Sequence, residues 1–561
     1  MPQLPQLFCS ARDSRFHAPQ PESARRRSGK VTVPSEPLGP FRALIAALLL
    51  AFAAAAIPLP AAAGAPAPSP AARAAWGFAR GDLAPHPEVR FGVLPSGMRY
   101  ALMRSDRPSG GLAARLHVAG GAMLEGRREQ GFMHLIEHMI FHGSANIPEG
   151  ALAPVLARAG LARWSDFHAF TSPDETVYRL DLARSDEAAR ATALTLMREI
   201  ASNLVFSRRS VAGARNRVIA EIAARDTVAD RIATALDRLL VPDTRLARGP
   251  VAGTPASVRR AKPAALRRLY ALHYTPARAT LVLVGDFDPA AAEAELAARF
   301  ADWAGPAPAA PPLRPPPIAP ADETKVGVFV DPSAPTTVTI AALAPLDPRA
   351  DAGSRRDSHF LERLGFEMLN RRLAGIAAGP DPPFAGATAA VYDHFSAVRL
   401  ARVDVEARDR DWRRALARAA AELRRALEQG FSPAELAEQL AATRRSLARD
   451  AAPRTASALA DAIVEAAGRG IVFTAPADAA ATEAYVARVR LADVNAAFSA
   501  AWAPPARRLF VSHHRPIPTA EAEIAAGWAS AIAAPQVPEP PALIGRGARA
   551  DSRTGPDREL Q

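Results

Sequence analysis

The chain is 561 residues long, which exceeds one ordinary domain and predicts two or three domains, each with its own hydrophobic core. Apolar residues make up 49% of the sequence, a proportion typical of globular proteins, and this excludes a disordered or fibrous chain. Basic residues outnumber acidic ones by 69 to 57, but they form no dense runs with interleaved aromatics, which argues against a nucleic-acid partner.

Residues 1–63 are typical of a secretory signal region. An apolar stretch, ALIAALLLAFAAAAI at 43–57, follows Arg42 and precedes the small residues that end at Ala63. A membrane anchor is the alternative interpretation, but about 15 apolar residues ended by Pro58 are fewer than the roughly 20 that span a bilayer. We therefore expect cleavage near Ala63, no stable membrane span in the mature chain, and an exported, periplasmic protein.

The only cysteine is Cys9, which lies within this signal region. A mature chain cut near Ala63 has no thiol, so it forms no disulfide, and any metal must be bound by histidine and carboxylate side chains.

A Pro/Ala-rich spacer is expected at 64–87, followed by a first domain at 88–304. Periodicity and turn residues predict its elements in chain order: strands at 89–105 and 111–124, helices at 131–142 and 150–159, a strand at 176–183, helices at 186–204, 211–240 and 263–272, a strand at 279–287, and a helix at 289–300.

Residues 305–324 are so rich in proline that neither helix nor sheet can continue through them, which predicts a linker between domains. The segment 325–515 repeats the earlier order of strands followed by helices, so we expect two similar α+β units in tandem. Residues 516–561 show no periodic pattern and are expected to be a disordered tail.

Residues 134–138 read HLIEH, a pattern typical of a zinc site on a helix. His134 and His138 are four positions apart, so on a helix both imidazoles leave the same face and can share one metal. Three protein ligands with a fourth position open to water define a catalytic zinc centre. Glu137 lies beside that position, where a carboxylate takes the proton of a water that attacks a carbonyl. The pattern predicts peptide hydrolysis without a covalent intermediate.

Ordinary helix residues are the alternative interpretation, since a lone histidine on an apolar helix face is more often a core residue than a ligand. With 12 histidines in 561 residues, two His and one Glu in this frame arise by chance on the order of 0.01 times per chain. The helix is apolar nearly all round from Met133 to Phe141, which predicts burial. Buried His and Glu need partners, and a metal supplies them.

Several segments together resemble the pitrilysin or insulinase family of zinc metallopeptidases, in which two histidines flank the glutamate in this order. The resemblance covers residues 88–515. It is carried by GFMHLIEHMIFHGS at 131–144, TSPDETVYRLDL at 171–182, RVIAEI at 217–222, AGTP at 252–255 and YTPARATLVLVGDFDP at 274–289. It implies an α+β fold of two tandem homologous domains, each a mostly antiparallel sheet packed with helices.

The third zinc ligand in such proteins is a glutamate on a later helix, and the matching position is Glu221, 83 residues beyond His138. The resemblance therefore implies one Zn²⁺ per chain, bound by His134, His138 and Glu221, with Glu137 as the general base. Glu175 and Tyr178 resemble structural positions of the family around the active-site strand, and nothing in the sequence assigns them chemistry.

Three positions depart from the family pattern. Ala214 stands where a second glutamate usually supports the metal from outside its ligand shell, which predicts weaker metal affinity or a slower rate. His168 replaces an asparagine that holds the substrate backbone, and His142 replaces another asparagine. His142 lies one turn beyond His138, but three imidazoles in a straight row do not converge on one tetrahedral ion, so we do not expect it to be a ligand.

The second domain contains HFLER at 359–363, in which Arg363 stands where the second ligand would be. A cation in that position repels zinc, so we expect this domain to be non-catalytic, as in the family.

Family members close a clamshell from two halves of two domains each, and this chain supplies one half. We expect a second half, either another copy or a partner subunit, with a peptide or unfolded polypeptide as substrate. The alternative is a non-catalytic peptide-binding or assembly subunit, which Ala214 and His168 favour.

Overall fold

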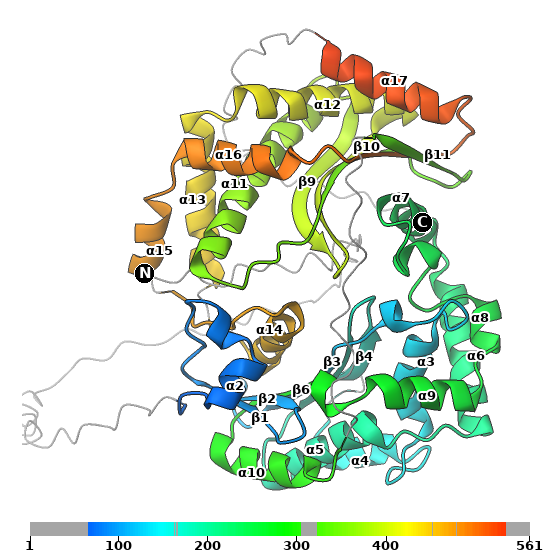
Figure 1. Cartoon of the computed structure of the whole chain (residues 1–561), viewed down its shortest axis with the longest axis vertical. Coiled ribbons are helices and arrows are strands. Elements are labelled where there is room, and N and C mark those ends of the chain that lie inside the picture. Colours follow the sequence, from blue (N-terminus) through cyan, green and yellow to red (C-terminus); the bar gives the residue numbers. More distant parts are fainter. Residues whose placement is uncertain are drawn as a thin grey trace, which may run out of the picture.

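Short strands, two of them buried along their whole length, build a sheet at the centre of the first domain (Figure 1). The computed structural model describes residues 65–304 and 323–534, apart from positions 162, 164, 165, 451, 452 and 478. The sheet has the spatial order β1-β2-β6-β3-β5-β4. Its strands are β1 (Val89–Val93), β2 (Arg99–Arg104), β3 (Leu112–Val118), β4 (Phe167–Thr171), β5 (Thr176–Leu182) and β6 (Ala279–Gly285). Only β2 and β6 are parallel neighbours.

Helices cover one face of this sheet and form the largest core with it. They are α3 (Phe132–His138), α4 (Leu152–Arg158), α5 (Glu187–Ser202), α6 (Arg208–Arg225), α8 (Pro255–Arg259), α9 (Pro263–His273) and α10 (Pro289–Phe300). All seven residues of α3 are buried, as its apolar surroundings predicted. The short helix η3 (Met139–His142) continues α3.

A second sheet, in the order β7-β11-β8-β10-β9, repeats the topology of the first sheet without its outermost strand β1. Its strands are β7 (Lys325–Val330), β8 (Thr337–Ala344), β9 (Phe384–His394), β10 (Val398–Ala407) and β11 (Arg507–His513). Again only one pair, β7 with β11, is parallel. The predicted α+β fold of two similar, mostly antiparallel domains is confirmed.

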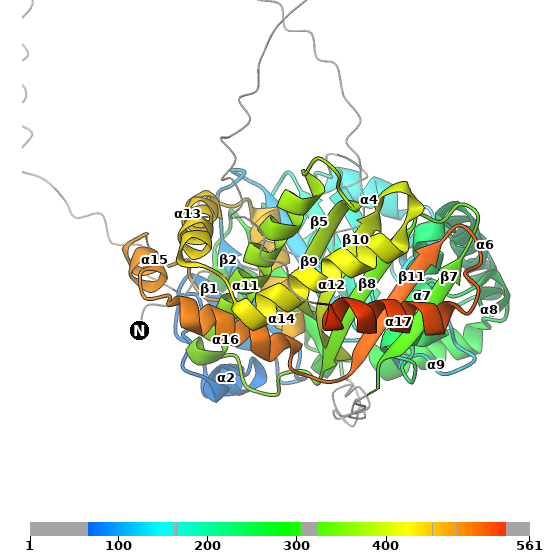
Figure 2. The ribbon, with the colours of Figure 1, turned by 90° about the horizontal axis from the view of Figure 1, so that it is seen from above.

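One face of the second sheet is covered by helices from its own half of the chain, seen from above in Figure 2. They are α11 (Gly353–Ala377), α12 (Trp412–Gln429), α13 (Pro433–Asp450), α15 (Ala479–Val486), α16 (Leu491–Trp502) and α17 (Ala520–Ala533).

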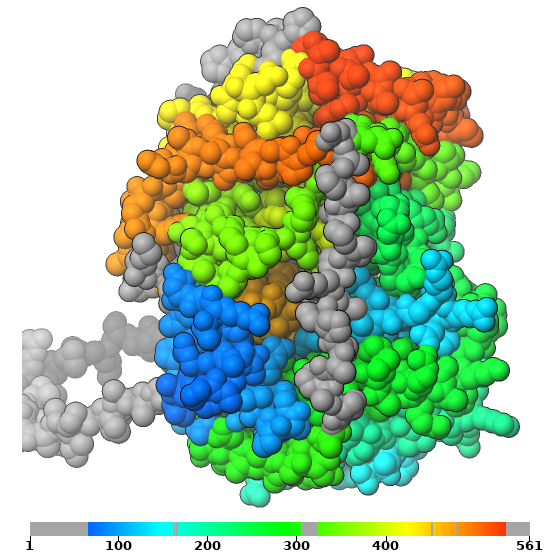
Figure 3. Space-filling view, in the orientation of Figure 1, coloured from blue at the N-terminus to red at the C-terminus, as the bar shows by residue number. Residues whose placement is uncertain are grey.

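The opposite faces of the two sheets are covered by an exchange of helices. Helix α7 (Val228–Leu240), which precedes the linker, packs on the second sheet and buries Leu236 and Leu240 there. Helix α14 (Ala456–Arg469), which follows the linker, packs on β3 and β6 of the first sheet. Figure 3 shows this gold segment within the blue-green lower lobe. The two domains therefore complete each other's cores.

A buried ion-pair network attaches α14 to the first sheet. Arg115 on β3 is fully buried, and its guanidinium lies 2.6 Å from an oxygen of Asp461 on α14 and 2.7 Å from one of Asp181 on β5. Arg179 on β5 also pairs with Asp461, and the Ser457 hydroxyl accepts a hydrogen bond from Arg115. Such a pair is costly to disrupt, because removing one member leaves an uncompensated buried charge.

Two sequence predictions near the ends of the domains are wrong. The segment 64–87 is no simple spacer: it contains α2 (Pro70–Ala75), and Trp76 and Phe78 pack their rings on Phe91 at centroid distances of 4.8 and 5.0 Å. The predicted tail contains α17, whose Ile524 is fully buried against the second domain. In both segments, a few apolar side chains stand among small and polar residues, so the sequence shows no periodic pattern. Tertiary contacts nevertheless bury these side chains.

The single helix predicted at 211–240 is two helices. Helix α6 ends at Arg225, and α7 begins after Thr227, whose hydroxyl accepts a hydrogen bond from the Asp230 amide and caps the new helix. The break lets α7 leave the first domain for the second sheet.

The signal region, the linker residues 305–322 and the end of the chain from 535 onward lie outside the described residues. Within the described ranges, none of the helices combines the length and apolar character required to cross a bilayer.

We expect Arg115→Met to lower the free energy of unfolding by about 1 to 3 kcal/mol, because Asp181 and Asp461, 36% and 35% exposed, lose the buried hydrogen-bond donor that they share. Chemical denaturation followed by tryptophan fluorescence measures the change. Arg104→Met is the matched control, since that side chain is 71% exposed and its loss costs less than about 1 kcal/mol. Equal free energies of unfolding for the two variants would contradict a stabilising role for the Arg115 ion pairs.

Candidate metal centre

The helix that carries the HLIEH motif is anchored at its first turn. Its N-cap residue Gly131 has a φ of 83°, and a Cβ there would lie 2.3 Å from the Ala252 carbonyl oxygen, so glycine is required beside the AGTP turn. The buried Glu125 carboxylate accepts hydrogen bonds from the Gly131 and Met133 amides at 3.1 and 2.9 Å and pairs with Arg245 at 2.6 Å. These contacts fix the start of α3 against the rest of the domain.

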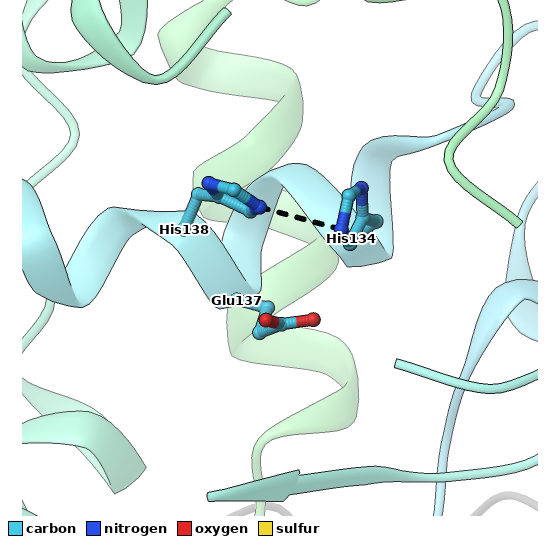
Figure 4. A group of neighbouring side chains, drawn as sticks. All are labelled: His134, Glu137 and His138. Atoms are coloured by element: carbon cyan, nitrogen blue, oxygen red, sulfur yellow. Dashed lines mark hydrogen bonds between the residues drawn. The ribbon is translucent and has the colours of Figure 1, made fainter. Parts of the chain in front are cut away.

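The two motif histidines direct their Nε2 atoms toward each other, 3.3 Å apart (Figure 4). Glu221, on α6, places Oε2 3.2 Å from the Nε2 of His138 and 3.7 Å from that of His134. In a tetrahedral zinc site with ligand distances of about 2.0–2.1 Å, ligand atoms are roughly 3.3–3.4 Å apart. The three atoms are therefore spaced as a zinc ion requires.

The electrostatics of His134 and Glu221 also suit a cation. Burial, followed by the neighbouring His138, lowers the pKa of His134 to about 4, so its imidazole is neutral at pH 7. The hydrogen bond with His138 is the main cause that lowers the pKa of Glu221 to about 2, so its carboxylate is ionised. Neutral imidazoles and an anionic carboxylate are the protonation states that bind zinc.

Glu137 is buried on the same helix, and its carboxylate is the third member of a cluster with the two histidines, in which ligand atoms lie within 4.8 Å of one another. Its Oε2 accepts a 2.7 Å hydrogen bond from the Thr171 hydroxyl on the edge strand β4. Burial raises the pKa of Glu137 to about 7, although His138 and Thr171 act in the opposite direction. A bound cation would lower that pKa.

Both Glu137 and Glu221 could in principle complete the ligand set with the histidines. The Glu221 oxygen is at tetrahedral spacing from both imidazoles, whereas one oxygen of Glu137 is held by Thr171. The geometry favours Glu221 as a metal-binding residue and leaves Glu137 beside the metal position.

His142 and His168 lie away from this arrangement. The Nδ1 of His142 is 3.1 Å from Glu149 Oε1, and its ring packs on Gly213, where a Cβ would lie 2.6 Å from it. His168 is exposed on β4 and faces Arg179 in register. Because side chains alternate along a strand, His168 and Thr171 point to opposite faces of the sheet.

The support behind the histidines is sparse. Ala214 is fully buried and offers no carboxylate. In the part of the chain that the structure describes, the Nδ1 atoms of His134 and His138 have no hydrogen-bond partner. Metal-binding histidines usually donate from this atom to a carboxylate, carbonyl or water.

Two functional candidates were missed by the sequence reasoning. Thr171 was noted only as part of a family segment, and its contact with Glu137 spans 34 residues, so no local pattern reveals it. Arg225 has its Nη1 2.7 Å from Oε1 of Glu221. Its position one turn after Glu221 is a signal that the sequence does contain.

The remaining family positions have structural partners. Glu175 pairs with the buried His117 at 3.1 Å, and the Tyr178 hydroxyl is 2.9 Å from that of Tyr274.

The HFLER segment of the second domain forms ion pairs instead of a metal cluster. His359 lies 3.6 Å from Asp347, Glu362 pairs with Arg399, and the Arg363 guanidinium stacks over a phenylalanine ring at 5.4 Å. Among the described residues, only the cluster in the first domain groups three metal-binding side chains.

Family models match both domains. The model of the insulinase family, peptidase family M16, matches residues 100–248, and the model of the M16 inactive domain matches residues 260–443. Together with the fold, these matches define the class: the chain belongs to the insulinase family of peptidases.

The relatives include a probable zinc protease named PqqL from Haemophilus influenzae, 28% identical over 203 residues that cover 36% of this chain and 22% of the relative. The crystal structure of the first half of the periplasmic protease PqqL from Escherichia coli superposes with a TM-score of 0.71 at 20% identity and covers 81% of this chain and 99% of that half. Full-length PqqL from the same organism gives a TM-score of 0.72, also at 20% identity, over 85% of this chain and 54% of that protein. The chain thus spans about half of the full-length structure and about a fifth of the curated relative.

Proposed function

We propose that this chain is a zinc-dependent metalloendopeptidase that hydrolyses peptides or unfolded polypeptides. The observation that carries this proposal is the spacing of the His134, His138 and Glu221 atoms, 3.2 to 3.7 Å from one another, with a buried carboxylate beside them. The names of the relatives as zinc proteases support the choice of metal and of reaction.

In this proposal, His134, His138 and Glu221 hold the ion, and zinc bound there supplies Lewis-acid chemistry that activates water and polarises the scissile carbonyl. Glu137 is the general base. Thr171 holds Oε2 of Glu137 at 2.7 Å, so the other carboxylate oxygen is free to accept the water's proton and pass it to the leaving amine. Arg225 holds Oε1 of Glu221, which leaves Oε2 directed at the histidines.

The polypeptide would bind as an added strand along β4. This strand is the edge of the first sheet, next to β5 only, and it carries Thr171 at its end. An edge strand offers unpaired backbone groups to an extended peptide, and β4 would bring the bound peptide beside the metal position.

A second candidate function is a zinc-binding subunit without catalysis. It is favoured by the buried Ala214, because the absence of an outer carboxylate there lowers metal affinity and rate. Zinc content and peptide turnover distinguish the two candidates.

Two substitutions distinguish the proposed general base, Glu137, from the proposed zinc ligand, Glu221. Glu137→Gln should retain about one zinc per chain and lose at least about 100-fold in turnover, because the amide cannot accept the water's proton. Glu221→Ala should lose zinc together with activity. Elemental analysis and cleavage of a quenched fluorescent peptide measure both quantities.

The matched control is His142→Ala, which removes a histidine one turn beyond His138. This variant should bind as much zinc as the unmodified protein. Full zinc in Glu221→Ala would mean that the third ligand lies elsewhere, and unchanged turnover in Glu137→Gln would remove the role of Glu137. Stoichiometric zinc without any turnover in the unmodified protein would favour the second candidate function.

We also propose that the site works inside a two-half assembly, in which another copy, a partner subunit or a further stretch of polypeptide supplies the second half. The near-complete match to the first half of PqqL supports this, since that protease has a second half of similar size. An open half-shell leaves the catalytic groups in water, where they orient and polarise a peptide poorly. We expect weak turnover by the monomer and at least about tenfold more in the assembled form. Light scattering coupled to the peptide assay tests this, and vigorous turnover by a strict monomer would contradict it.

Export to the periplasm is the proposed location. The signal-like residues 1–63 and the periplasmic description of PqqL support it. We expect exported protein to begin near Gly64 and to lack Cys9, as determined by N-terminal sequencing. Protein that keeps Cys9, or that is found only in membranes, would contradict this location.

A further inference from the structure

A strongly basic surface lies on the helices around the candidate site. Residues 207–218 and 254–274 contain nine arginines and lysines and no aspartate or glutamate. We call their exposed members the basic face: Arg208, Arg209, Arg217, Arg259, Arg260, Lys262, Arg267 and Arg268. The chain as a whole is nearly balanced, with 69 basic and 57 acidic residues, so this local excess is not a property of the composition.

Tertiary contacts bring the two segments together. The Arg215 side chain of α6 donates a 3.0 Å hydrogen bond to the carbonyl of Arg259 at the end of α8. The Arg267 side chain of α9 donates a 3.0 Å hydrogen bond to the Phe206 carbonyl just before α6. Helices α6, α8 and α9 are neighbours on the right of Figures 1 and 2, so the two basic segments lie side by side.

Most of this charge has no internal partner. Arg209 lies 3.8 Å from Glu149, and Arg268 pairs with Glu129. Within residues 65–304 and 323–534 as described, no carboxylate lies within salt-bridge distance of the other six members: Arg208, Arg217, Arg259, Arg260, Lys262 and Arg267. Gathered like charges repel one another and attract an anionic partner.

The basic face is continuous with the candidate site through α6. At about 1.5 Å per residue, Arg208 lies roughly 20 Å along the helix from Glu221. Arg217 and Arg225 stand one turn before and one turn after Glu221, and the Arg225 side chain is 76% exposed while it contacts that carboxylate. A polypeptide that leaves the site along α6 therefore passes Arg217 before it reaches the rest of the basic face beyond the start of the helix.

We propose that the basic face binds an acidic segment of the polypeptide substrate, placed about six to ten residues from the scissile bond. An extended chain advances about 3.3 Å per residue, so roughly six residues cover the distance from Glu221 to Arg208. This inference rests on the proposed peptidase function and adds a substrate class to it, namely polypeptides with a cluster of aspartate or glutamate on one side of the cleaved bond.

An anionic lipid surface and a nucleic acid are less suited to the same residues. Leu272 and Val205, exposed by 51% and 40%, border the face, but membrane-surface and single-strand-binding sites generally use exposed aromatics as well. The aromatic residues of the two segments are Tyr270 and Tyr274, and both are buried. An acidic polypeptide needs only the cations.

The test compares two labelled peptides with the same cleavable core. One has four glutamates placed six to nine residues from the core, and the other has glutamines there. Full-length Glu137→Gln protein binds them without turnover, and fluorescence anisotropy gives each Kd. Several exposed ion pairs together should make the glutamate peptide bind roughly tenfold more tightly at low salt. The difference should vanish at about 0.5 M salt, where surface charges are screened.

The variant that removes charge from the face is Arg259→Gln/Arg260→Gln/Lys262→Gln, made in the same background. It should lose most of the preference for glutamate. The matched control, Arg73→Gln/Arg80→Gln/Arg408→Gln, removes three exposed cations elsewhere and should keep the preference. Circular dichroism and zinc content, equal in all three proteins, exclude a folding defect.

Equal affinity for the two peptides, or equal loss in both triple variants, would overturn the proposal. Binding to vesicles of phosphatidylglycerol and phosphatidylcholine that is lost in the face variant, without a peptide preference, would identify a lipid surface and likewise overturn it. Binding is measured without turnover, so the two proposals can fail separately. If the variant prefers the glutamate peptide but the unmodified protein cleaves nothing, only the peptidase function is refuted.

Discussion

The contact between α3 and α6 is the constraint on which the candidate centre depends. Glu221 approaches the two imidazoles only because α6 lies very close to α3, with Ala214 and Val218 fully buried. Gly213 also permits this close packing of the helices, because a side chain there would collide with His142. Ala214 therefore combines two effects: the small side chain packs in the helix interface, and the outer carboxylate that the family usually has at this position is absent.

The second domain supports the candidate centre from behind the first sheet. Its helix α14 closes the back of the first sheet through the buried Arg115 and Asp461, and that sheet holds the strand from which Thr171 reaches Glu137. Helix α7, which follows α6 in the first half of the chain, covers the back of the second sheet. Each domain thus supplies an apolar cover for the other's sheet, which lacks that cover when alone.

Local patterns were sufficient for most elements and for part of the site. Strand alternation, proline at helix starts and the HLIEH spacing are short-range signals, and they led to the α+β class and to His134, Glu137 and His138. Predictions failed where burial depends on distant partners: the packed Trp76 within the expected spacer, the helix α17 and the division of 211–240 into two helices. A few apolar residues among small ones do not reveal which surface they will meet.

The sequence by itself determined that two imidazoles and a carboxylate share one buried helix, because residues four apart return to the same helical face whatever surrounds them. It also determined that two similar units follow each other along the chain. Only the tertiary structure decided how Glu221 faces the histidines, that Thr171 holds the base, and that cations from separate segments form one surface beside the site. These relations join residues that are tens of positions apart, and their distances depend on how closely the helices pack against each other and the sheet.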